Sequence, residues 1–132
     1  MLVVDASVLA PALADDGPDG DAARARLHAE SLVAPELIDL EVLSVLRQRN
    51  AGGAIDARRA QLALTDLFEL PMQRASHRPL LARCWELRTN LTVYDAAYVA
   101  LAETIGAPLL TADERLANAP GITCRVEVLR GP

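Results

Sequence analysis

Short, mostly apolar runs recur along the chain, separated by longer segments with helical periodicity. A continuous apolar run of about four to eight residues, bounded by polar or turn-forming residues, is typical of a strand buried on both faces of a sheet. Five segments have this character to differing degrees, and we predict strands at residues 2–5, 31–34, 72–75, 108–111 and 125–129. The segment at 72–75 is the weakest of them.

The intervening segments are predicted to be helices. Proline in the first turn, aspartate at the N-cap and glycine after the last turn mark helix ends. Pro35, Asp56 and Gly106 stand at such positions. The predicted helices span residues 6–14, 21–30, 35–50, 56–70, 79–90, 92–105 and 113–118, with a loop at 15–20.

Strands that alternate with helices favour parallel pairing, because each helix returns the chain to the same end of the sheet. We therefore predict an α/β fold, a three-layer sandwich whose central parallel sheet of four to five strands is flanked by helices. The 132 residues contain no internal repeat, low-complexity tract or linker. This predicts a single domain over residues 1–132.

Composition adds detail to this picture. Hydrophobic residues make up 52% of the chain and aromatic residues 3%, so an aliphatic core is expected. Cys84 and Cys124 fit no metal-binding spacing, and each is expected to be a small buried hydrophobe rather than half of a disulfide. No basic segment precedes Leu2, and no apolar stretch approaches the length of a membrane span, so a cytoplasmic location is expected.

Charge limits the kinds of partner. The chain has 13 basic and 18 acidic residues, a net charge of −5, and every basic residue is arginine. This balance argues against a protein that holds nucleic acid by bulk electrostatic attraction. It is compatible with several carboxylates gathered at one site and offset by divalent cations. Arginine also suits bidentate contacts with phosphate.

Two aspartates stand at the ends of predicted strands. Asp5 ends the first strand, and Asp113 follows the strand at 108–111. Ligands of open α/β sheets bind beyond the carboxyl ends of the strands, so both carboxylates are well placed for chemistry. The alternative for each is a structural N-cap of the helix that follows.

Two further acids lie in predicted helices. Glu41 has apolar neighbours, and glutamate is rarely buried unless it is paired or binds a cation; a solvated stripe shared with Asp39 is the alternative. Asp95 lies near a helix N-terminus, along the same edge as Asp5, three residues after Thr92. For Asp95 the alternative is a capping box with Thr92.

Brought together, four carboxylates would form a site of hard oxygen ligands, which suits Mg²⁺ or Mn²⁺. Such a site can activate water and neutralise charge on a phosphodiester. His28 and His77 have no serine or cysteine partner in a recognisable motif and are expected at the surface. Metal-assisted hydrolysis is therefore the predicted chemistry.

Four motifs, in order along the chain, carry a resemblance to a known family. They are LVVDAS at residues 2–7, PELIDLEV at 35–42, LTVYDAAYVALA at 91–102 and LLTAD at 109–113. Together they resemble the motifs of PIN-domain ribonucleases, specifically the VapC-type toxins of bacterial toxin–antitoxin pairs. The third motif is the most specific, and the match covers almost the whole chain.

The resemblance implies a PIN-like sheet and a divalent-metal endoribonuclease, usually a homodimer, that is inhibited by a small antitoxin protein. Mg²⁺ or Mn²⁺ is the implied cofactor and RNA the implied substrate. The catalytic and metal-binding acids become Asp5, Glu41, Asp95 and Asp113. Ser7 and Thr111 match accessory hydroxyl positions, which orient the carboxylates or a metal-bound water.

One position departs from the pattern that the resemblance implies. Some relatives have another acid two residues after the fourth, whereas this chain has Arg115 there and Glu114 beside it. We expect one firmly bound metal ion, with a second arriving with the substrate. The expected reaction is in-line attack of a metal-activated water on an RNA phosphodiester, which leaves a 5′-phosphate. Candidates for phosphate contacts, with solvated helix faces as the alternative, are Arg47, Arg49, Arg58 and Arg59.

Three other protein classes share some of these features. A phospho-acceptor receiver domain needs a lysine, and the chain has none. A haloacid-dehalogenase-like phosphatase needs a second aspartate where this chain has Ser7. A degenerate PIN fold that only binds or scaffolds stays open as the alternative, although the presence of all four acids argues against it.

Overall fold

The computed structural model describes residues 1–131 and contains one five-stranded sheet. The strand order is β3–β2–β1–β4–β5, and every neighbouring pair is parallel. The strands are β1 (Leu2–Val4), β2 (Leu32–Pro35), β3 (Gln73–Ala75), β4 (Leu109–Thr111) and β5 (Val126–Val128). The predicted parallel sheet is confirmed.

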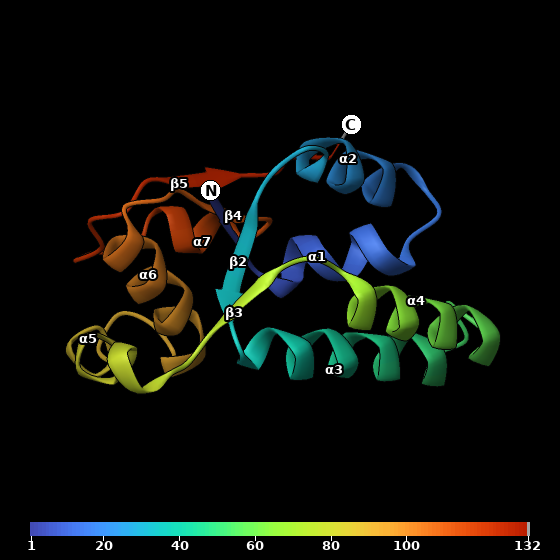
Figure 1. Cartoon of the computed structure of the whole chain (residues 1–132), viewed down its shortest axis with the longest axis horizontal. Helices are drawn as coiled ribbons and strands as arrows, with labels where there is room; N and C mark the ends of the chain where they lie inside the picture. The colour runs from blue at the N-terminus through green and yellow to red at the C-terminus, as the bar shows by residue number, and fades with distance from the viewer. Residues whose placement is uncertain (132) are drawn as a thin grey trace.

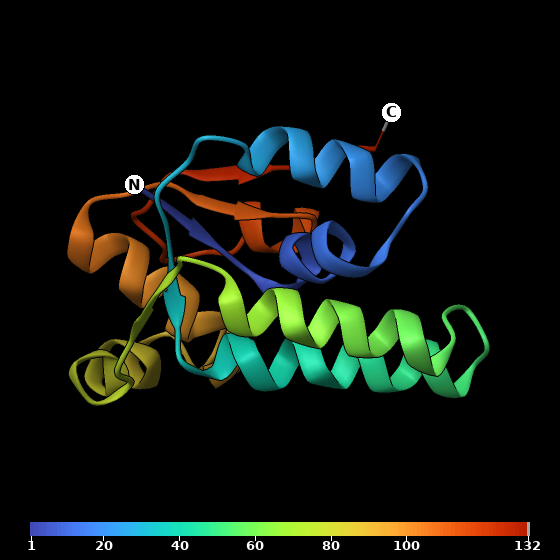
Figure 2. The same ribbon diagram turned by 45° about the vertical axis from the view of Figure 1, so that its right-hand side comes forward.

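Helices cover the sheet on both sides (Figures 1 and 2). They are α1 (Ala6–Ala14), α2 (Pro18–Leu27), α3 (Leu37–Ala51), α4 (Ala57–Glu69), α5 (Leu81–Glu86), α6 (Val93–Ile105), α7 (Glu114–Ala117) and a 3₁₀ helix, η1 (Arg78–Leu80). Helices α5 and α6 lie on one side and α1 and α2 on the other, while α3 and α4 run side by side as a hairpin (Figure 2). The predicted three-layer α/β fold is confirmed.

Prolines account for the main boundary errors. Helix α2 begins at Pro18 rather than Asp21, because proline is well suited to the first turn, so the loop predicted at 15–20 is shorter. Pro35 ends β2 instead of opening α3. The helix predicted at 79–90 is a 3₁₀ turn followed by α5, which ends at Glu86.

The core is aliphatic, as predicted, with one exception. Tyr98 is 1% exposed and is the largest fully buried side chain among the described residues, whereas Phe68, Trp85 and Tyr94 are exposed. Cys84 is buried and Cys124 partly buried, and both are free thiols. No helix within residues 1–131 is long and apolar enough to cross a membrane.

The strand order places a reversal at β1. From β1 the chain extends the sheet through β2 and β3 on one side, and later through β4 and β5 on the other. The carboxyl ends of β1 and β4 therefore lie side by side at the point where the order reverses. In open α/β sheets this is where ligands bind.

Candidate active site

Asp5 lies at the carboxyl end of β1 and is buried, with 7% of its surface exposed. Its Oδ1 accepts hydrogen bonds from the backbone N–H of Ser7 (3.1 Å) and from the Ser7 hydroxyl (2.5 Å). Its Oδ2 accepts a hydrogen bond from the Thr111 hydroxyl at 2.5 Å. Burial raises the pKa of Asp5, and these hydrogen bonds oppose the rise. Asp5 is thus an N-cap of α1 and a fixed carboxylate at the same time.

Ser7 and Thr111 also connect the ends of β1 and β4. The Ser7 hydroxyl oxygen accepts a hydrogen bond from the backbone N–H of Ala112 (2.8 Å). The Thr111 hydroxyl oxygen accepts a hydrogen bond from the backbone N–H of Asp113 (3.1 Å). Each hydroxyl therefore donates a hydrogen bond to Asp5 and accepts a hydrogen bond from the backbone that follows β4. Both hydroxyls predicted to be accessory groups contact Asp5 directly.

Glu41 lies in the second turn of α3 and is half-buried. The Tyr98 hydroxyl, from α6, donates a hydrogen bond to its Oε1 at 2.5 Å. Burial raises the pKa of Glu41, the Tyr98 hydrogen bond lowers it, and the charges of Asp95 and Asp5 raise it further. Asp39 pairs instead with Arg74 at 3.0 Å, which argues against the alternative of a solvated stripe shared by the two acids.

Asp95 lies in the first turn of α6. Its backbone N–H donates to the hydroxyl oxygen of Thr92, the N-cap, at 3.1 Å, so one of the two hydrogen bonds of the alternative, a capping box, is present. Burial raises the pKa of Asp95, and the charge of Asp113 raises it further. Asp95 and Asp113 line one pocket of about 230 Å³ together with Arg115.

Asp113 follows β4 and caps the short helix α7, where its Oδ1 accepts a hydrogen bond from the Arg115 backbone N–H at 2.9 Å. The Arg115 guanidinium also pairs with both carboxylate oxygens, Nε with Oδ1 at 3.2 Å and Nη2 with Oδ2 at 3.0 Å. This pairing lowers the pKa of Asp113. The fourth acid is therefore already paired with a cationic side chain.

The chemistry of this donor set fits a hard divalent cation. All four acids offer carboxylate oxygens, and the charges of Asp5, Asp95 and Asp113 act on their neighbours' pKa values. Within residues 1–131, no three acidic, histidine or cysteine side chains lie close enough to hold an ion as they stand. Like charges repel, and a cation between the carboxylates would offset that repulsion.

Comparison with known proteins gives this site a family. The family described as the PIN domain matches residues 2–122. The chain belongs to the PIN-domain family. All four acids and both accessory hydroxyls lie within the matched range.

Curated PIN-domain relatives match almost the whole chain. Ribonuclease VapC1 of Mycobacterium tuberculosis is 42% identical over 129 residues, which cover 97% of each chain. Ribonuclease VapC9 of the same organism is 43% identical over 132 residues, which cover 98% of each. The predicted resemblance to VapC-type PIN domains is confirmed.

Solved structures agree on the PIN fold. The crystal structure of Mycobacterium tuberculosis VapC20, a sarcin–ricin loop cleaving toxin, matches with a TM-score of 0.72 at 15% identity, covering 93% of this chain and 97% of that one. VapBC2 of Rickettsia felis, solved with a DNA fragment from its promoter, matches with a TM-score of 0.70 at 13% identity, covering 98% of both chains. At these identities the similarity concerns the fold.

Two residues of this PIN domain were missed by sequence reasoning. Tyr98 was not singled out, although its place three residues after Asp95 puts both on one face of α6. His77 is not a simple surface residue, because its Nε2 accepts a hydrogen bond from the backbone N–H of Leu37 (3.0 Å) at the start of α3. No local sequence pattern links His77 to a helix that begins 40 residues earlier.

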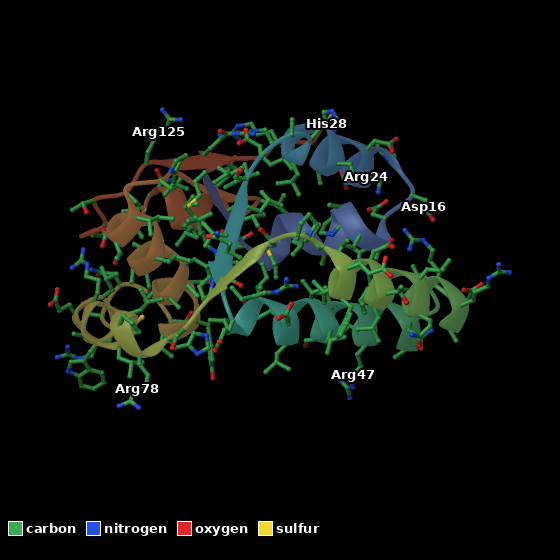
Figure 3. The ribbon with its side chains drawn as sticks, viewed as in Figure 1. Asp16, Arg24, His28, Arg47, Arg78 and Arg125 are labelled. Atoms are coloured by element: carbon green, nitrogen blue, oxygen red, sulfur yellow. The ribbon has the colours of Figure 1, made fainter. Side chains whose placement is uncertain are left out.

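The arginines predicted to contact phosphate differ in availability. Arg59 pairs with Asp16 at 3.0 Å, and Arg49 lies 4.0 Å from Asp15. Arg47 projects outward from α3 (Figure 3), and among residues 1–131 neither Arg47 nor Arg58 forms an ion pair. Arg47 and Arg58 are therefore the stronger candidates of the four.

Proposed function

We propose that this chain is an endoribonuclease that hydrolyses RNA phosphodiester bonds and acts as the toxin of a type II toxin–antitoxin pair. The observation that carries the proposal is the buried Asp5 carboxylate, held by two hydroxyl groups where β1 and β4 meet, whose charge acts on Glu41 together with that of Asp95. The full-length similarity to VapC ribonucleases supports it. We place this activity in one nuclease domain over residues 1–132 of a cytoplasmic protein.

The four acids, Asp5, Glu41, Asp95 and Asp113, would together hold Mg²⁺ or Mn²⁺. When bound, such an ion lowers the pKa of water and neutralises charge on the phosphate. Ser7 and Thr111 keep Asp5 in one orientation, which reduces the rearrangement that catalysis needs. The reaction is in-line attack of water on the phosphodiester, and the product carries a 5′-phosphate.

The Arg115–Asp113 pair supports one firmly held ion. The guanidinium offsets the charge of Asp113, which would otherwise add to the attraction for a second cation. The Arg115 side chain is 91% exposed, and ion pairs in such positions contribute little stability. Asp113 is therefore free to exchange Arg115 for a second ion that arrives with the RNA.

The nuclease is tested with purified protein and RNA in Mg²⁺ or Mn²⁺, with EDTA as the control. We expect cleavage with either metal, loss of cleavage in EDTA, and products that are substrates for a 5′-phosphate-dependent exonuclease. Full cleavage in EDTA would contradict a metal-dependent site.

The toxin role is tested in cells. Expression of the chain alone should arrest growth, and co-expression of its cognate small antitoxin should restore it. We expect that antitoxin to be encoded by a short reading frame immediately upstream, with a DNA-binding N-terminus. Harmless expression of folded, metal-binding protein would favour the alternative, a degenerate PIN fold that acts as a scaffold.

We also propose that the protein is a homodimer. An apolar surface on α5 and α6, formed by Leu81, Trp85, Val93 and Tyr94, has side chains that are 58%, 64%, 48% and 62% exposed. It surrounds a hollow of about 420 Å³. Exposed apolar patches of this kind mark interaction sites. Light scattering should give the dimer mass for the native chain and the monomer mass for Trp85→Asp.

A further inference from the structure

Tyr98 differs from every other aromatic residue of the chain. Its side chain is 1% exposed, whereas Phe68, Trp85 and Tyr94 are between 62% and 89% exposed. Packing alone does not require tyrosine here, because phenylalanine would fill the same space without a hydroxyl to satisfy. A buried hydroxyl is costly unless it is hydrogen-bonded. The partner of this hydroxyl is Oε1 of Glu41.

This hydrogen bond joins two elements that carry different acids. Tyr98 and Asp95 are three positions apart on α6 and share one face of the helix. Glu41 is 57 positions from Tyr98, on α3. Helix α6 therefore supplies one acid of the site and also the group that holds another. The 2.5 Å O–H···O contact is in the range of strong, charge-assisted hydrogen bonds.

We propose that Tyr98 is a positioning residue, whose hydroxyl holds Oε1 of Glu41 and leaves Oε2 as the oxygen available to the metal ion. The proposal rests on the proposed metal-dependent nuclease. It assigns to Glu41 the kind of support that Ser7 and Thr111 give to Asp5. Hydrogen-bond partners of metal ligands act in this way, by restricting the orientations of the ligand before the ion arrives.

The test compares Tyr98→Phe with Thr104→Val, which loses a hydroxyl from the same helix whose partner is the Ala100 carbonyl and not an acid of the site. Mn²⁺ affinity is measured by calorimetry on the full chain without RNA, beside RNA cleavage at limiting Mn²⁺. We expect Tyr98→Phe to bind Mn²⁺ about tenfold to a hundredfold more weakly and to cleave correspondingly more slowly. Thr104→Val should match the native protein in both measurements.

A third variant, Glu41→Gln, measures how far the Mn²⁺ affinity falls when the charge of Glu41 is lost. Tyr98→Phe should lie between the native protein and Glu41→Gln in Mn²⁺ affinity, with an unchanged circular dichroism spectrum. Loss of the fold, or an effect as large as that of Glu41→Gln, would overturn the positioning role.

Two further outcomes separate this proposal from the proposed function. Native protein that binds Mn²⁺ no differently from Tyr98→Phe would overturn the role of Tyr98 alone. Native protein that binds no Mn²⁺ and cleaves no RNA would overturn the nuclease and, with it, the role of Tyr98.

Discussion

The two aspartates that follow β1 and β4 occupy equivalent places and have opposite surroundings. Both cap the helix that comes next. Asp5 is buried, and both of its oxygens accept hydrogen bonds from hydroxyl groups. The Asp113 side chain is 33% exposed, and its partner is the exposed guanidinium of Arg115. Neutral hydroxyl donors hold the first carboxylate, and an exposed guanidinium pairs with the second.

From this contrast we infer which part of the site is already in place before a metal ion or RNA would bind. Burial raises the pKa of Asp5, whereas Arg115 lowers the pKa of Asp113. Burial leaves the charge of Asp5 poorly solvated, so a cation bound there would offset the cost of ionising it. The Asp113 end already has its charge offset. We infer a rigid Asp5 end and an adjustable Asp113 end of one site.

Thr111→Val should give the largest effect of the variants that test the rigid end. It removes the donor to Oδ2 of Asp5 and nearly preserves side-chain shape. We expect RNA cleavage and Mn²⁺ affinity to fall about tenfold to a hundredfold. Thr104→Val is the matched control, because the Thr104 hydroxyl bonds to the Ala100 carbonyl within α6. Native activity in Thr111→Val would show that Asp5 needs no such support.

Arg115→Asp tests the adjustable end. It replaces the cation that covers Asp113 with a further carboxylate, so we expect calorimetry to show two Mn²⁺ ions per chain instead of one. Arg115→Ala removes the guanidinium without adding a ligand, so it should bind a second ion more weakly than Arg115→Asp but more tightly than the native chain. One ion bound by Arg115→Asp would remove Arg115 as the reason for a single-metal site.

The melting temperature in EDTA should change in opposite directions when the charge of Asp5 and the charge of Asp113 are removed. In the folded protein the pKa of Asp5 is raised above its ordinary value of 3.8. Ionisation of Asp5 therefore destabilises the fold, and stability is lost as the pH rises from 3.8 through the raised pKa. The lowered pKa of Asp113 stabilises the fold. This stability is present above pH 3.8 and is lost as the pH falls below 3.8 through the lowered pKa.

Asp5→Asn should therefore raise the Tm at pH 7, and Asp113→Asn should lower it slightly. Asparagine caps helices as well as aspartate does, so capping is preserved in both variants. Both differences should shrink as the pH falls towards 3. Shifts of the same sign at pH 7 would contradict the contrast between the two ends.

His77→Ala should have the smallest effect on catalysis. It removes the hydrogen bond to the Leu37 backbone at the start of α3, one turn before Glu41. We expect a loss of about 1 kcal/mol in the free energy of unfolding, measured by urea denaturation. Cleavage should change less than about threefold, since Tyr98 still holds Glu41. A loss of cleavage as large as that of Thr111→Val would place His77 among the supports of the site.

Local sequence patterns predicted the strands and the acids for a physical reason. Buried strands such as Leu2–Val4 need continuous apolar runs, and an acid at the end of such a run is conspicuous. The partners of those acids were harder to predict, because they depend on tertiary contacts. Nothing near Glu41 indicates Tyr98, and the spacing of Arg115 from Asp113 does not reveal that the guanidinium folds back onto the carboxylate. Pro35 was misplaced because its pairing with Ala75 of β3, which extends β2 to this residue, is a tertiary contact that the local pattern does not reveal.

RNA cleavage by Asp5→Asn and Asp95→Asn in saturating Mg²⁺ tests most directly whether the carboxylates form one catalytic site. Each change removes one carboxylate charge and several kcal/mol of transition-state stabilisation. At about 1.4 kcal/mol per tenfold, this corresponds to a loss of roughly a thousandfold in rate. We predict that loss in both variants, with circular dichroism spectra that match the native protein. Cleavage at the native rate by both variants would contradict the assignment of the carboxylates as one catalytic site.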